Sequence, residues 1–193
     1  MEERKELSQG KAVGLIIITY AILTIIFGTI YSLLGLLVSK ISGNVIILST
    51  ISVMLSIAII YFSWKLSIMI TFKNRSSSGL DAKKITKYLA IFVIGMSIIS
   101  MAYDVYNSKI AIEEQFSNSF LEDKDVVSAF TQEELQERAN ENIENMNMSK
   151  KQTYTSIFVM GILALGINLL ILNIVAKKNI EKYNGVVQIE KNI

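Results

Sequence analysis

Two charged side chains, Lys65 and Asp104, stand inside long apolar stretches of this sequence. Charges within membrane segments are costly, so they are candidates for ion relay or gating. Ser63 precedes Lys65 by two residues, and these are the two residue types that serine–lysine hydrolases combine. Residues two apart on a helix point to different sides, however, so the spacing does not predict a catalytic dyad.

Histidine and cysteine are both absent. The chain therefore lacks the side chain that most often acts as a general base near neutral pH, and it has no thiolate for catalysis or metal binding. Met146 and Met148 resemble the thioether pairs that bind copper(I), but one pair without cysteine or histidine does not predict a site. We expect no catalytic residue, no metal and no cofactor.

Four apolar runs dominate the sequence, and the helices that they predict position these residues. Each approaches or exceeds the roughly 20 helical residues that cross a bilayer core of about 30 Å. No proline interrupts them. They predict an all-α, polytopic four-helix bundle with transmembrane helices over residues 12–38, 45–72, 88–107 and 153–176.

The first run is too long to be a cleavable signal peptide, whose apolar stretch has about 7–15 residues. We interpret it as a retained helix that follows a short tail over residues 1–11.

Basic residues predict the orientation. Lysine and arginine collect in 1–11, in the loop 73–87 and in the tail 177–193, and the positive-inside rule makes these segments cytoplasmic. The segment 108–152 then lies outside; it has ten acidic and five basic residues. Because isoleucine, lysine and asparagine are abundant, we expect a bacterial plasma membrane with both termini in the cytoplasm.

Depth in the membrane favours an anchoring role for Lys65. It lies about 30 Å along its helix from Val45, near the cytoplasmic boundary, where its long stem can extend to water. Tyr61, Phe62 and Trp64 beside it are typical of the aromatic belt at that boundary. Gating or ion relay is the alternative.

Asp104 lies about 24 Å beyond Tyr88, near the outer boundary, so it is too far from Lys65 to pair with it. Lys40 and Lys109 are its candidate partners. Anchoring at the interface is again the favoured role, with gating or ion relay as the alternative. The absence of a carboxylate at mid-membrane weighs against a proton-coupled transporter.

Small and amide side chains are candidates for helix packing, because small residues and interhelical hydrogen bonds hold membrane helices together. Small residues recur every seven positions in the first helix, serines do so in the second, and the fourth carries two asparagines. The candidate packing or interaction residues are Gly28, Ser32, Ser56, Asn168 and Asn173. They serve either contacts within the bundle or contacts with another subunit. For Asn168 we expect a hydrogen bond to a serine of the second helix.

The outer segment has its own helical pattern. Ile112 and Phe116 predict that the third helix continues outward. Thr131 and Glu134 form a capping-box pattern. The apolar stripe behind it comprises Leu135, Ala139, Ile143 and Met146. Because no glycine or proline occurs from Thr131 to Met160, this helix is expected to run straight into the fourth span and to form an outer helical hairpin.

The layout of short and long outer loops resembles that of tetraspanins in topology alone, because their cysteine signature cannot occur here. The missing catalytic side chains and the patterned outer segment favour a non-catalytic protein that acts through protein contacts, as an accessory, sensor, scaffold or immunity-type subunit. The expected partners are the bilayer and a protein or second copy. A net charge of +2 does not favour nucleic acid. A small oligomeric transporter or channel subunit, lined by Asn168, Asn173 and the serines, is the alternative.

Overall fold

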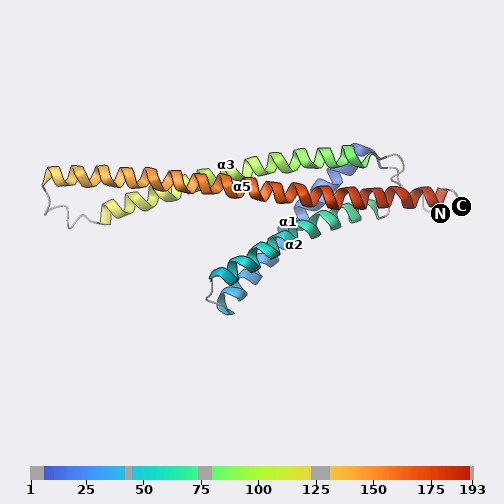
Figure 1. Ribbon diagram of the computed structural model, residues 1–193, viewed down its shortest axis with the longest axis horizontal. Coiled ribbons are helices and arrows are strands. Elements are labelled where there is room, and N and C mark those ends of the chain that lie inside the picture. The colour runs from blue at the N-terminus through green and yellow to red at the C-terminus, as the bar shows by residue number, and fades with distance from the viewer. Residues whose placement is uncertain (1–6, 42–44, 74–79, 123–130, 192–193) are drawn as a thin grey trace. The chain divides into compact units, whose positions relative to one another are not determined.

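The computed structural model describes residues 7–41, 45–73, 80–122 and 131–191, and these residues are almost entirely helical (Figure 1). The helices are α1 (Gln9–Ile41), α2 (Val45–Phe72), α3 (Ala82–Glu122) and α5 (Gln132–Lys191). Each is long and apolar enough to cross a membrane. The all-helical fold is confirmed, and the four apolar helices indicate a membrane protein.

Two helix starts are fixed by side-chain caps. Asp81 Oδ1 accepts hydrogen bonds from the backbone amides of Lys83 (2.9 Å) and Lys84 (3.2 Å) at the start of α3. At the start of α5, the Thr131 amide donates to Glu134 Oε2 (2.8 Å), and the Glu134 amide lies 3.4 Å from Thr131 Oγ1. The capping-box prediction is therefore confirmed. Such caps satisfy amides that have no partner within the helix.

The last helix is a single element of 60 residues. At 1.5 Å per residue it is about 90 Å long, three times the bilayer core. The predicted continuity from the outer segment into the fourth span is confirmed. The 41 residues of α3 extend about 60 Å, so both helices reach well beyond the apolar layer.

The chain divides into two compact units. Unit 1 comprises Met1–Val93 and Gly166–Ile193, and unit 2 comprises Ile94–Leu165. Unit 1 thus holds α1, α2, the start of α3 and the end of α5. Unit 2 holds the remainder of α3 and α5.

Side chains from all four helices are buried in unit 1. The buried apolar residues include Ala12 and Ile16 of α1, Trp64, Ile68 and Phe72 of α2, Ile85, Leu89 and Val93 of α3, and Leu172, Val175, Ala176 and Ile180 of α5. Lipid tails are as apolar as these side chains, so close packing and polar contacts must supply the specificity.

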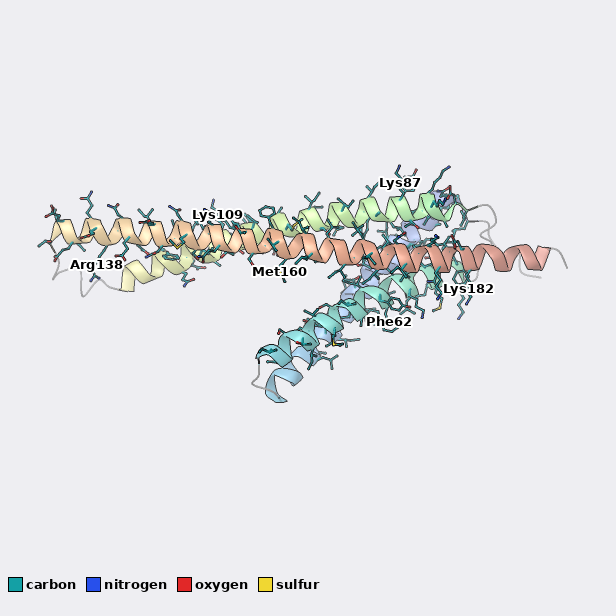
Figure 2. All side chains as sticks on the ribbon, in the orientation of Figure 1. Phe62, Lys87, Lys109, Arg138, Met160 and Lys182 are labelled. Atoms are coloured by element: carbon teal, nitrogen blue, oxygen red, sulfur yellow. The ribbon has the colours of Figure 1, made fainter. Side chains whose placement is uncertain are left out.

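Trp64 joins three helices of unit 1. It is fully buried, its ring stacks on Tyr20 of α1 with centroids 3.8 Å apart, and its Nε1 donates to Asn168 Oδ1 of α5 over 2.8 Å. Two expectations are therefore wrong. The partner of Asn168 on α2 is the indole rather than a serine, and Trp64 belongs to the core rather than to an aromatic belt. Phe62, labelled in Figure 2, and Tyr61 do stay exposed.

Two further contacts connect the helices of unit 1. The hydroxyl of Tyr31 on α1 and Ser52 Oγ on α2 lie 2.8 Å apart in a hydrogen bond. The rings of Phe72 on α2 and Tyr183 on α5 stack with centroids 5.9 Å apart. Like Trp64, both pairs combine an aromatic ring with a partner far away in the sequence.

Glycines differ in how closely they are approached. In unit 2, a Cβ added at Gly161 of α5 would overlap the side chain of Met101 of α3. At Gly14, Gly28 and Gly35 of α1, an added Cβ meets nothing within 4 Å. Close approach at a glycine is thus observed at Gly161, while these three glycines of the seven-residue row lie in open space.

The indole–amide contact is tested by a double-mutant cycle with Trp64→Phe and Asn168→Leu. Phenylalanine keeps a ring beside Tyr20 but cannot donate to Asn168. We expect a coupling free energy of about 0.6–1.7 kcal/mol for unfolding in detergent micelles, the range for hydrogen bonds between membrane helices. Phe62→Leu combined with Asn168→Leu is the control and should be additive within about 0.5 kcal/mol. A cycle without coupling would contradict the role of the contact.

Gly161→Ala and Gly28→Ala should change stability in opposite directions. Alanine favours a helix over glycine by up to about 1 kcal/mol, and at Gly28 no neighbour opposes this gain. At Gly161 the new methyl group displaces Met101, and overpacking of this kind costs about 1–3 kcal/mol. Thermal unfolding in detergent measures both, and Met101→Ala should rescue Gly161→Ala. Equal stabilisation by the two alanines would contradict the prediction.

Candidate functional site

The part of unit 2 at the start of α5 places apolar and acidic side chains on different faces of that helix. Half-buried positions recur at spacings of four and three residues, at Leu135, Ala139, Asn142 and Met146. Glutamates occupy exposed positions 133, 134, 137, 141 and 144. At 3.6 residues per turn, the glutamates cover the face opposite the half-buried positions.

The predicted apolar stripe is correct for three of its four residues. Leu135, Ala139 and Met146 are half-buried, whereas Ile143 is 54% exposed. Ile143 follows Ala139 by four residues, and the alternation of four and three places Asn142 on the packed side instead. A four-residue spacing drifts by about 40° around a helix, which accounts for the error.

A groove runs between α3 and α5 in this part of unit 2. It has a volume of about 570 Å³. Its apolar lining comes from Phe116 of α3 and from Ala139, Ile143 and Met146 of α5, and Glu113, Ser117 and Asn142 supply polar groups. An apolar floor of this kind suits an apolar side chain of a partner.

An ion pair crosses this groove region. Lys150 Nζ lies 2.7 Å from Glu113 Oε1, with exposed side-chain fractions of 18% and 44%. The hydrogen bond from Lys150 lowers the pKa of Glu113 below its ordinary value. The two residues are 37 positions apart, so no local pattern predicted the pair. Only the side-by-side packing of α3 and α5 brings them together.

Glu134 has a separate, structural role. Its carboxylate accepts from the Thr131 amide and hydroxyl, and the backbone hydrogen bond is the main reason its pKa is lowered. Glu137, Glu141 and Glu144 lie beyond the first turn and are exposed. Like charges three or four residues apart destabilise a helix by a few tenths of a kcal/mol per pair. This row is therefore unfavourable for the helix by itself.

The candidate residues Gly28, Ser32 and Ser56 lie on the surface of unit 1. Gly28 is half-buried, and Ser32 and Ser56 are exposed. The two hydroxyls donate within their own helices, to the carbonyls of Gly28 and Ser52. Their role in packing or in binding a subunit stays a prediction.

The two candidate asparagines point in different directions. Asn168 is half-buried and accepts from Trp64, and the phenol of Tyr20 also interacts with it. Asn173 is exposed. Five residues turn a helix by about 140° from its starting face, so the two amides do not share a surface. Trp64 and Tyr20 were missed as partners because the sequence does not show which way each helix faces.

The charges within the apolar runs also have defined surroundings. Lys65 is half-buried and its Nζ lies 5.7 Å from the centre of the Tyr61 ring, a cation–π contact. Asp104 is exposed and lines a cavity of about 580 Å³ in unit 2 with several serines. Within the described ranges Asp104 forms no ion pair. The side chain of Lys40, one expected partner, lies outside them.

In the part of the chain that the structure describes, no group of three histidine, cysteine, aspartate or glutamate residues lies close enough together to hold a metal ion.

No family model matches the chain, and no curated protein or solved structure shows significant similarity to it. The groove between α3 and α5 that Phe116 and Met146 line and the glutamate row of α5 together form the candidate interaction site.

The Glu113–Lys150 contact should depend on pH. Because pairing lowers the folded-state pKa of Glu113 from its usual 4.5, the contact is complete above that pH and is lost as pH falls through the lowered value. Spin labels on cysteines introduced at Gln115 and Asn145 report the α3–α5 distance, and the chain has no other cysteine. We expect the distance distribution to broaden at low pH.

Two variants complete this test. Glu113→Gln should show the broad distribution at every pH, while Glu114→Gln, at the neighbouring exposed acid, should behave like the unsubstituted protein. A distribution in Glu113→Gln that stays narrow near neutral pH would mean that the ion pair does not hold α3 to α5.

Proposed function

We propose that this chain is a non-catalytic integral membrane protein that acts by binding other proteins, as an accessory, sensor, scaffold or immunity-type subunit. The binding surface is the outer segment 108–152, which forms a helical hairpin from the end of α3 and the start of α5. The four apolar helices form the membrane bundle, and both termini lie in the cytoplasm of a bacterial cell.

The observation that carries the proposal is the exposed row of Glu137, Glu141 and Glu144 on α5. The row is locally unfavourable because its members repel one another. A basic partner segment would relieve that repulsion and would gain electrostatic steering on approach. The apolar groove lined by Phe116 and Met146 offers the same partner an anchoring point.

The arrangement of basic residues supports the orientation. Exposed lysines gather where α1 and α3 begin and where α2 ends, and on the final turns of α5. They are Lys11, Lys73, Lys83, Lys84, Lys87, Lys177, Lys178 and Lys182. Figure 2 labels Lys87 and Lys182 among them. By the positive-inside rule, this end of unit 1 faces the cytoplasm.

The alternative is a small oligomeric transporter or channel subunit lined by Asn168, Asn173 and the serines. Asn168 is engaged by Trp64 in the core of unit 1, while Asn173 faces outward. Ser56 also faces outward and bonds within its helix. These groups do not converge on one path within a single chain, so this alternative requires several copies to assemble with the exposed Asn173 and Ser56 facing a shared path.

The proposal is tested with the triple variant Glu137→Gln, Glu141→Gln and Glu144→Gln. Removing the repulsion should leave α5 intact while reducing partner capture, measured by chemical cross-linking in the native host and quantitative affinity purification. The control replaces Asn140, Asn145 and Asn147 with glutamine on the same helix and should preserve capture. Replacing residues 109–152 with a flexible glycine–serine linker should abolish it.

Recovery of the same partners by the linker variant would overturn the proposal. Flux measurements on the purified protein in vesicles distinguish the two functions. The transporter alternative requires solute flux, and Asn168→Leu or Asn173→Leu should reduce it. Flux of that kind, together with undiminished function in the triple glutamine variant, would establish the alternative instead.

A further inference from the structure

A second groove lies in unit 1, where α1 and α3 begin side by side (Figure 1). Its volume is about 620 Å³. Gln9, Gly10 and Val13 line it from α1, and Lys84, Tyr88, Ile91 and Phe92 line it from α3. It contains no residue of the outer segment, so it is separate from the proposed protein-binding site.

One end of this groove carries hydrogen-bond donors and a positive charge. Gln9 Nε2 is buried and has no hydrogen-bond partner, which is unfavourable for a buried donor. The first hydrogen bond of α1 runs from Ala12 N to Ser8 O, so the Gly10 amide precedes it and finds no acceptor within the helix. Lys84 adds an exposed ammonium group. Such donors suit an anion.

The amides at the start of α3 are already occupied. Asp81 accepts from the backbone of both Lys83 and Lys84. The carboxylate therefore serves as the cap of α3, and the remaining donors of the groove are Gln9 Nε2, which has no partner, and the Gly10 amide, which has no acceptor within its helix. Among the described residues at the starts of these two helices, the exposed lysines, Lys11, Lys83 and Lys87 among them, outnumber Asp81.

The other end of the groove is apolar. Val13 lies four residues beyond Gln9, and Ile91 and Phe92 lie seven and eight residues beyond Lys84. These spacings correspond to about 6–12 Å along the helices, the distance from a lipid headgroup to the first part of its acyl chains. Tyr88 lies between the two ends, and tyrosine is enriched at that level of a membrane.

We propose that this groove binds an anionic phospholipid. Its phosphate contacts Lys84, Gln9 and the Gly10 amide, and one acyl chain lies over Val13, Ile91 and Phe92. The order of polar and apolar groups along the groove follows the order within a lipid molecule. The proposal depends on the membrane setting of these helices and is independent of the proposed protein partner.

Two features select a lipid over free phosphate. The apolar half would have no role with an inorganic ion, and it includes Ile91, a large side chain that is 56% exposed. The second feature is the position of Ile91, which lies along the membrane-crossing part of α3 rather than in the loop before that helix. An acyl chain covers this surface while the donors hold the headgroup.

Native mass spectrometry of the full-length protein in a neutral detergent tests the proposal. The probes are phosphatidylglycerol, phosphatidylcholine with the same acyl chains, and inorganic phosphate. We expect preferential binding of phosphatidylglycerol. Lys84→Gln should weaken this binding about fivefold, as expected for loss of one lysine at an anionic headgroup, and Ile91→Ser should weaken it as well. Lys87→Gln, outside the groove lining, should retain it.

Equal weakening by Lys84→Gln and Lys87→Gln would overturn the site, since it would indicate general surface charge. The site would also be overturned if phosphatidylcholine, or inorganic phosphate, bound as tightly as phosphatidylglycerol. A photoactivatable phosphatidylglycerol provides a readout with the unsubstituted protein. Label on peptides that contain Val13 or Ile91 supports the groove, and label confined to unit 2 contradicts it.

Discussion

Hydrocarbon offers no hydrogen-bond partner to a backbone amide or carbonyl, and this constraint governs the whole chain. In an apolar layer each spanning segment must satisfy its own backbone, which an α-helix does. Several threonine hydroxyls follow the same rule. Thr24, Thr29 and Thr71 each donate to the carbonyl four residues earlier, so these polar groups are satisfied without reaching a neighbouring helix.

In the described part of unit 1, specific polar and aromatic contacts cross between helices. Trp64 combines a stacked ring with a hydrogen bond to Asn168, and Tyr31 bonds Ser52. Aromatic side chains with one polar atom suit this purpose, because the ring fills space and the polar atom fixes its orientation. Where lipid provides no hydrophobic drive between helices, such contacts select one packing over others.

Sequence patterns predicted the features that depend on a single helix. The apolar runs, the Thr131–Glu134 cap and the unbroken passage into the fourth span each follow from residues close together in the chain. The partners of Asn168 and Glu113 depend on how two helices face each other, and Lys150 lies 37 residues from Glu113. Small rotations about a helix axis change those partners. For the same reason, Ile143 was expected on the packed side but is exposed, and Asn142 occupies a half-buried position instead.

The uninterrupted length of α5 has a mechanical consequence. Bends in helices arise mainly at proline, at certain glycines or at inserted turns, and the chain has no proline. Gly161 and Gly166 lie within α5, but the helix continues through both of them, so one unbroken run of backbone hydrogen bonds joins the Thr131 end to the end that bears Tyr183. A change at one end of such a helix can reach the other end along a single continuous backbone.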